Sequence, residues 1–310
     1  SDLARFYCSP APVQSHEKHR RVGSRVVTSP RALLTAWNIR AKKQLGQNFL
    51  NDPNLARAIV EKAGLARDDV VLEIGPGLGA ITVPAAKIAR RVIAVDKDGR
   101  IIDLLHTELM AAGIHNVEIR EADILRVDLA SIHREAGRPL VVMGNLPYNI
   151  SSQVVVQLIH GRGYVDRAVL MLQKEMAQRI CAEPGSRDYG RLSVMLGYCA
   201  RTQILMPVRA SLFFPAPKID STVIGIRFAD PPAVCADDER LLFRVIKAAF
   251  GKRRKTLRNA LSQSDLKLDA ATCQGLLIQA QIDPMRRAET LSVPGFVRLS
   301  NAIGNHLRTA

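Results

Sequence analysis

The fold of this chain is decided by residues 70–79, Val70-Val71-Leu72-Glu73-Ile74-Gly75-Pro76-Gly77-Leu78-Gly79. The run at 70–74 is short and largely apolar, which is typical of a strand buried on both faces of a sheet. The glycines that follow let the backbone turn tightly and approach a ligand at the start of the next helix. The stretch therefore predicts a strand, a turn and a helix, with a binding site at the turn.

Outward from this stretch, apolar runs alternate with segments of helical pattern. Further strands are expected at 91–96, 117–120, 140–143 and 168–172, and helices at 80–87 and 99–112. Strands that alternate with helices predict a mostly parallel sheet covered on both faces, so the expected fold class is α/β and Rossmann-like. Ligands of such sheets bind at the carboxyl ends of the strands.

Composition divides the chain into three regions. Residues 1–27 carry Pro, Ser, His and Arg without apolar periodicity, which predicts a disordered N-terminal extension. A catalytic domain is expected over 28–230, and it begins with an amphipathic helix over 29–38. The composition changes at Asp230-Pro231-Pro232, and residues 231–310 are predicted to form a smaller domain of short helices.

The overall composition indicates a globular protein with a polyanionic partner. The chain has 310 residues, a formal charge of +15 and a pI of about 10.1. Seven Lys or Arg and two acids fall in the first forty residues, so +10 of the charge lies beyond them. Such basicity favours nucleic acid over a membrane surface. The sequence contains no apolar run of about 18 residues, so no membrane span is predicted. Five scattered cysteines favour a reducing, cytoplasmic location without a metal site.

The glycine turn and two aspartates form a candidate cofactor site. Gly75 and Gly77 lie in the turn, and Asp96 ends the next strand, where a carboxylate can bind ribose hydroxyls. Asp123 follows the third strand and can accept a hydrogen bond from an adenine amine, although a lone Asp there is more often a cap. The pattern predicts a nucleoside-containing cofactor and leaves its identity open, because dinucleotide sites share the glycine pattern.

Asn145-Leu146-Pro147-Tyr148 follows the apolar run at 140–143 and is typical of enzymes that methylate exocyclic amines of nucleobases. The lone pair of such an amine is delocalised into the ring, so the site needs two acceptors for its hydrogens and a flat surface for the base. The Asn145 side chain and the Leu146 carbonyl can be the acceptors. Pro147 stiffens the turn, and Tyr148 offers the flat surface. The alternative is an ordinary turn after a buried strand.

Two later features fit a nucleic-acid substrate. Phe213 can stack on the second face of an extruded base, a contact worth about 1–3 kcal/mol; the alternative is a core aromatic. The predicted phosphate contacts are Lys252, Arg253, Arg254, Lys255 and Arg258. A solvated helix face is the other interpretation of these charges.

Five motifs, in this order, carry a resemblance to a known family. They are KQLGQNFL at 43–50, EIGPG at 73–77, NLPY at 145–148, FFPAPKIDS at 213–221 and RRKTLRN at 253–259. From about residue 40 to 305 the chain closely resembles the small-subunit rRNA adenine dimethyltransferases, the kasugamycin-sensitivity methylase family. The resemblance implies that S-adenosylmethionine methylates N6 of two adjacent adenosines near the 3′ end of 16S-type rRNA. It also implies immature small ribosomal subunits as the partner, a role in their biogenesis, and a monomer that needs no metal.

The resemblance also assigns roles to residues. Asn48 and Leu50 are expected to close over the cofactor, with Gly75 at its methionine end. Asp96 is expected to bind the ribose, Asp123 the adenine, and Asn145 to lie between cofactor and target. Asp96 stands where the family often has Glu, and either carboxylate can accept two hydroxyls. Residues 1–27 lie outside the resemblance.

Three other functions share parts of this pattern. An NAD-dependent oxidoreductase accounts for the glycine turn and Asp96, but it gives no role to 145–148. A DNA adenine methylase shares the tetrapeptide with a different substrate. A non-catalytic ribosome-assembly or transcription factor on the same fold needs neither the tetrapeptide nor the glycine turn.

Overall fold

The computed structural model describes residues 29–252 and 254–309, and of Lys43 it describes the backbone alone. The extension predicted at 1–27 lies outside the described residues. Within the described ranges, no helix combines the length and apolarity needed to cross a membrane.

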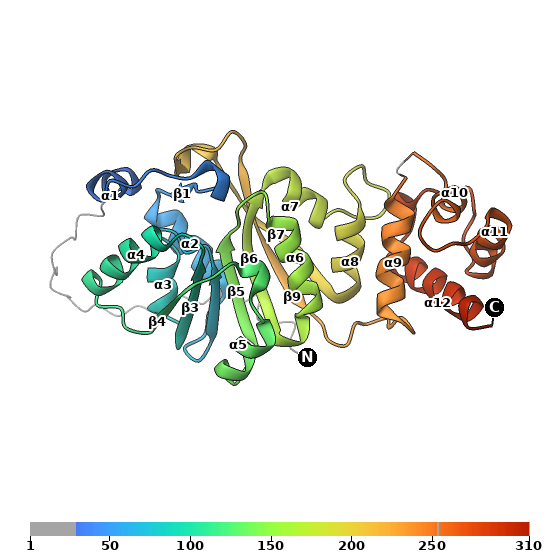
Figure 1. Cartoon of the computed structure of the whole chain (residues 1–310), viewed down its shortest axis with the longest axis horizontal. Coiled ribbons are helices and arrows are strands. Elements are labelled where there is room, and N and C mark those ends of the chain that lie inside the picture. Colours follow the sequence, from blue (N-terminus) through green and yellow to red (C-terminus); the bar gives the residue numbers. More distant parts are fainter. Residues whose placement is uncertain (1–28, 253, 310) are drawn as a thin grey trace, which may run out of the picture.

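The centre of the molecule is a seven-stranded sheet within the described ranges, in the order β4-β3-β2-β5-β6-β9-β7 (Figure 1). Its strands are β2 (Val70–Ile74), β3 (Arg91–Asp96), β4 (Val117–Glu121), β5 (Leu140–Asn145), β6 (Val165–Gln173), β7 (Ala200–Val208) and β9 (Ser221–Phe228). The first five are parallel, whereas β9 runs antiparallel between β6 and β7. The predicted α/β class is confirmed. The strand order reverses between β2 and β5, where sheets of this kind form a ligand crevice.

The helices predicted at 80–87 and 99–112 are present, and helices cover both faces of the sheet (Figure 1). They are α2 (Pro53–Ala63), α3 (Thr82–Ala86), α4 (Gly99–Ala111), α5 (Leu129–Ala136), α6 (Ser151–His160), α7 (Lys174–Ile180) and α8 (Arg191–Cys199). Successive side chains of β2 point to opposite faces. Leu72 joins the core that includes α6, while Val71 joins the core beneath α2 and α3. Burial on both faces explains why this strand is almost wholly apolar.

The first described segment crosses the carboxyl ends of the strands. It contains α1 (Pro30–Ala36), the short helix η2 (Lys43–Leu45) and β1 (Phe49–Leu50), which pairs antiparallel with β8 (Phe213–Phe214). Ser29 caps α1 by accepting a hydrogen bond from the Ala32 N–H at 3.3 Å. The apolar side of α1 packs on α4, where Leu34 and Leu104 belong to one buried cluster. This packing fixes where the chain enters the sheet.

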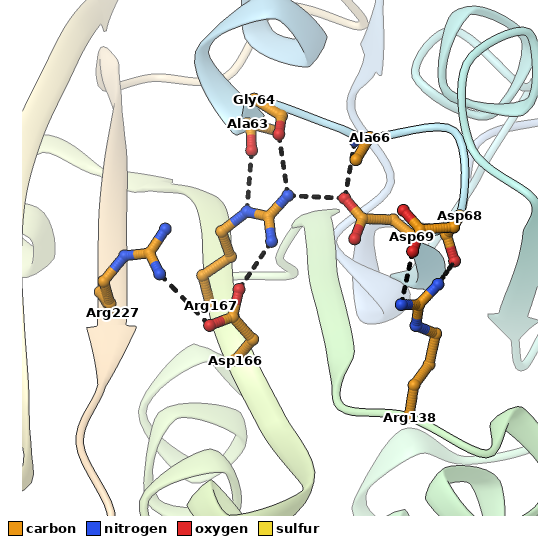
Figure 2. A network of polar contacts seen from close by, with 9 residues as sticks. All are labelled: Ala63, Gly64, Ala66, Asp68, Asp69, Arg138, Asp166, Arg167 and Arg227. Carbon is orange, nitrogen blue, oxygen red and sulfur yellow. Dashed lines mark hydrogen bonds and ion pairs between the residues drawn. The ribbon is translucent and has the colours of Figure 1, made fainter. Parts of the chain in front are cut away.

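An ionic cluster fastens α2 to the amino ends of the strands (Figure 2). The Arg167 guanidinium donates to the carbonyls of Ala63 and Gly64 at 3.0 and 2.9 Å, which satisfies the end of α2. It also pairs with Asp69 at 2.7 Å and with Asp166 at 2.6 Å. Helix α2, strand β6 and the turn before β2 are thereby held together.

Helices α9 (Glu239–Phe250), α10 (Leu257–Ser262), α11 (Ala270–Gln279) and α12 (Val293–Thr309) form the C-terminal part. Asp238 caps α9 by accepting the Leu241 N–H at 3.0 Å. Helix α9 packs against α8 and α12, and its buried Leu242 belongs to the same core as Leu72 of β2. The C-terminal helices therefore share a core with the sheet layer, and the domain limits at 28–230 and 231–310 stay a prediction.

Candidate active site

A cleft opens at the carboxyl ends of β2, β3, β4 and β5, beneath the segment that leads into β1. It encloses about 1130 Å³ of empty space, its open mouth included. All the predicted cofactor residues lie on its wall: Asn48, Leu50, Gly75, Gly77, Asp96, Asp123 and Asn145. Asn48 and Asn145, which are 97 positions apart in the sequence, are thus brought to one site.

The glycine turn brings backbone to the surface of this cleft. Gly75 and Gly77 have φ values of +67° and +54°, in the region that favours glycine. A Cβ added to Gly77 would come within 3.0 Å of the Phe49 ring. A side chain here would therefore displace the wall of the cleft as well as strain the turn.

The two predicted aspartates stand at neighbouring strand ends with different surroundings. Asp96 Oδ1 accepts the Asp98 N–H at 3.0 Å, and burial raises the pKa of the Asp96 carboxyl. Asp123 accepts from Lys97 Nζ at 2.9 Å, which lowers its pKa, and from the Leu125 N–H at 3.1 Å. Asp123 is therefore a cap, as the sequence allowed, and it also lines the cleft.

Glu73 is a cleft residue that the sequence interpretation did not single out. Its side chain is 1% exposed, and its Oε2 has no hydrogen-bond partner among the described residues. Burial raises the pKa of this carboxyl to about 7, with a smaller contribution from the nearby Asp96 carboxylate. The signal was available, since Glu73 is an acid within an otherwise apolar buried strand.

The tetrapeptide at 145–148 lies at the rim of the cleft, where β5 ends. Asn145 Nδ2 donates to the Asn48 carbonyl at 3.0 Å, so its side-chain oxygen is left as an acceptor. Leu146 is buried, and its N–H donates to the Met171 carbonyl at 3.1 Å. The Ile150 N–H donates to the Pro147 carbonyl at 3.2 Å, which closes a turn into α6. The segment therefore forms an ordinary turn and can still offer acceptors to an amine.

The two predicted base-stacking rings have unequal access. Tyr148 is half-buried, and its hydroxyl lies 3.4 Å from Ser221 Oγ. Phe213 is only 4% exposed and packs in the core with Leu50 and Val208. As the structure stands, Phe213 is a core aromatic. Its predicted stacking role requires its ring to become accessible when a base enters, and this role stays a prediction.

The predicted phosphate-binding residues lie away from the cleft, in the loop between α9 and α10 and, for Arg258, in the first turn of α10. Lys252, Arg254 and Lys255 are exposed, and Arg253 lies outside the described residues. Arg258 is half-buried, and its guanidinium donates to Gln274 Oε1 at 3.3 Å. The loop faces the same upper side of the molecule as β1 and α7 (Figure 1).

The fold and the cleft define a Rossmann-like methyltransferase that takes S-adenosylmethionine and acts on an exocyclic amine. Among the described residues, no group of three or more His, Cys, Asp or Glu could hold a metal ion. A family model described as ribosomal RNA adenine dimethylase matches residues 38–300. The chain belongs to the ribosomal RNA adenine dimethylase family, which confirms the resemblance carried by its motifs.

Individual relatives agree with this membership. The chain is 52% identical over 277 residues to ribosomal RNA small subunit methyltransferase A of Desulforapulum autotrophicum, covering 89% of this chain and 97% of the relative. It is 38% identical to the protein of the same name from Alkaliphilus oremlandii, covering 91% and 99%. A dimethyladenosine transferase structure from Plasmodium falciparum has a TM-score of 0.70 at 26% identity, covering 81% and 95%. The structure of 23S rRNA methyltransferase ErmE has a TM-score of 0.63 at 25% identity, covering 83% and 100%.

These similarities decide between the functions that the sequence left open. The predicted fold, the reaction class and the methyl donor are confirmed. The DNA methylase and the non-catalytic factor are not favoured.

Proposed function

We propose that the protein transfers methyl groups from S-adenosylmethionine to N6 of two adjacent adenosines near the 3′ end of small-subunit rRNA. The observation that carries this proposal is Asn145 at the rim of the cleft, with its amide nitrogen on Asn48 and its oxygen left to accept. The names of the bacterial relatives support the small subunit as the substrate.

The residues of the cleft fit the methyl donor. Gly75 and Gly77 have positive φ values, which favour glycine. Because glycine has no side chain, the backbone here leaves room for the cofactor. Asp96, Asp123, Leu50 and Asn48 all line the cleft. Asp96 would accept hydrogen bonds from the ribose hydroxyls and Asp123 one from the adenine amine, while Leu50 and Asn48 would cover the cofactor. When bound, S-adenosylmethionine supplies a methyl group that is already activated by a sulfonium.

The protein's own residues then act mainly by positioning. The Asn145 side-chain oxygen and the Leu146 carbonyl accept the two hydrogens of the target amine, which favours lone-pair character on its nitrogen. Pro147 fixes the turn that presents these acceptors. Tyr148 stacks on one face of the extruded base, and Phe213 stacks on the other after its ring is uncovered. Holding the reacting atoms in place accounts for most of the rate.

The C-terminal domain at 231–310 binds the RNA that surrounds the target, and the catalytic domain at 28–230 carries the cleft. Lys252, Arg254, Lys255 and Arg258, together with Arg253, contact phosphates. The protein acts as a monomer on immature small ribosomal subunits in the cytoplasm, where it contributes to their biogenesis.

Asn145→Ala tests this proposal because it removes one acceptor of the target amine while changing only one of the residues that line the cleft. We expect methyl transfer to immature small subunits to be abolished, while the affinity for S-adenosylmethionine changes by only a few-fold. Mass spectrometry of the rRNA measures dimethyladenosine, and calorimetry measures cofactor binding. The control is Asn305→Ala, at an exposed position of α12. Near-normal turnover by the Asn145 variant, or a preference of the wild type for DNA over small subunits, would contradict the proposal.

A further inference from the structure

Residues 42–50, which we call the strap, run across the cleft and form part of its wall. The far end of the strap is secured by β1, which pairs with β8, and by α2 directly after it. Asp52 caps α2 by accepting the Asn54 N–H at 2.8 Å, and Pro53 occupies the first turn. What holds the near end of the strap determines whether the cleft is covered.

At the near end, two side chains of the strap converge on one carboxylate, that of Asp98. Lys42 Nζ donates to Asp98 Oδ1 at 3.2 Å, and Gln47 Nε2 donates to Asp98 Oδ2 at 3.0 Å. Gln47 Oε1 accepts the backbone N–H of Lys42 at 2.7 Å, so its amide ties the strap to itself and to Asp98. Arg100 completes the group through Nε at 3.3 Å and Nη2 at 3.2 Å. Although burial acts in the opposite direction, these hydrogen bonds lower the pKa of Asp98 to about 2.

The side chain of Asp98 makes these contacts instead of capping the helix that follows it. It stands at the N-cap of α4, but its side chain makes no capping hydrogen bond. Asp128, at the N-cap of α5, does cap its helix and accepts the Ala130 N–H at 3.0 Å. A cap of this kind typically contributes about 0.5–2 kcal/mol to stability. The carboxylate of Asp98 is 2% exposed and is committed to the strap.

Asp98 is linked to both sides of the cleft, through its own backbone on the cofactor side and through the strap on the target side. On the cofactor side, the Asp98 N–H donates to Asp96 Oδ1, the proposed ribose acceptor, at 3.0 Å. On the target side, the Asn48 carbonyl accepts from Asn145 Nδ2 at 3.0 Å. Gly46 lies so close to the tetrapeptide that an added Cβ would come within 3.1 Å of the Pro147 Cβ.

We propose that Asp98 is a positioning residue whose hydrogen bonds to Lys42 and Gln47 latch the strap over the bound cofactor. The latch sets how long the cofactor stays bound, and it holds Asn48 against Asn145 so that the amine acceptor is correctly oriented. This inference rests on the proposed function, because it assigns the cleft to the methyl donor.

The dissociation rate of S-adenosylhomocysteine, measured by stopped flow, tests the latch without any RNA. We expect Asp98→Ala to raise this rate by about tenfold or more, since hydrogen bonds to a charged group are lost. The association rate should stay within about threefold, because an open strap does not obstruct entry. Asp98→Asn should fall between Asp98→Ala and the wild type, because an amide oxygen can still accept from Gln47. The matched control is Asp128→Ala, which removes a capping Asp without touching the strap.

A double-mutant cycle separates a latch from general destabilisation. Gln47→Leu should raise the dissociation rate by itself and add little to Asp98→Ala, because both changes open the same contact. Independent effects of the two changes, or a lowered melting temperature with an unchanged dissociation rate, would overturn the latch. Failure of the wild-type protein to bind either S-adenosylmethionine or S-adenosylhomocysteine would instead overturn the proposed function.

Discussion

The ionic cluster around Arg167 and the cofactor cleft hold buried charge at opposite ends of the strands. In the cluster, Arg167 meets Asp69, Asp166 and two helix-end carbonyls, so the charged groups have partners within the protein (Figure 2). In the cleft, Glu73 has an oxygen without a partner among the described residues, and burial raises the pKa of Asp96. The cluster satisfies its own charges and stabilises the fold, whereas the cleft leaves Glu73 Oε2 without a partner among the described residues.

The largest effect that would test this comparison is expected from Arg167→Met. The substitution leaves Asp69 and Asp166 without their buried cation and uncaps the end of α2. We expect the free energy of unfolding to fall by about 3–5 kcal/mol, as measured by urea denaturation. Arg227→Met is the control, because its contact with Asp166 is half-exposed and should contribute less than about 1 kcal/mol. Equal losses of unfolding free energy in the two variants would show that the buried ion pairs of Arg167 stabilise the fold no more than the half-exposed pair of Arg227.

Glu73→Gln should have a smaller effect with the opposite sign. The folded-state pKa of about 7 lies above the ordinary value of 4.5, so ionising this carboxyl opposes folding. The stability of the wild type relative to Glu73→Gln should therefore fall as the pH rises from about 4.5 to 7 and level off above that. At pH 8 the variant should gain up to about 3 kcal/mol relative to its difference at pH 4. Urea denaturation across this range, with exposed Glu61→Gln as the surface control, provides the measurement. A difference that does not change with pH would mean that burial does not raise the pKa of Glu73.

The smallest effect on stability is expected at the exposed cations Arg254 and Lys255, whose proposed role is to bind RNA. Replacing Arg254 and Lys255 with Gln should leave stability within about 0.5 kcal/mol. It should weaken RNA binding and reduce the salt slope of the affinity by about 0.7–0.9 per lost phosphate contact. Filter binding at several salt concentrations measures the slope, with exposed Lys62→Gln on α2 as the control. An unchanged slope would place this loop outside the RNA interface.

The parallel part of the sheet could be predicted because β2, β3, β5 and β6 contain short apolar runs, while β4 alternates apolar and charged residues. The meeting of Gly75, Gly77, Asp96, Asp123 and Asn145 in one cleft could also be predicted, since they lie at strand ends that must meet at one edge. Asn48 and Leu50 were expected there only from the family resemblance. Strands β7 and β9 were not predicted. Strand β7 is an edge with exposed Arg201 and Gln203 and a register shift after Ile204, so its sequence shows no regular alternation.

The contact between Lys42 and Asp98 and the burial of Phe213 depend on residues that are far apart in the sequence, so they could not be predicted from it. Lys42 and Asp98 are brought together only by the folded chain, and Asp98 by itself resembles any N-cap aspartate. Phe213 could be assigned to the base site or to the core from its sequence context. The structure buries it, because β8 pairs with β1 and places Phe213 opposite Leu50.

The packing of α1 on α4 has a spectroscopic consequence. Trp37 is the only tryptophan in the chain, and it is the C-cap residue of α1, five positions before the strap begins. Its side chain is 40% exposed, between Leu34 and Ile39, which are both buried. Indole emission from the intact protein therefore comes from one place, the segment that leads into the strap. Quenching of that emission by acrylamide reports on this segment without an attached dye.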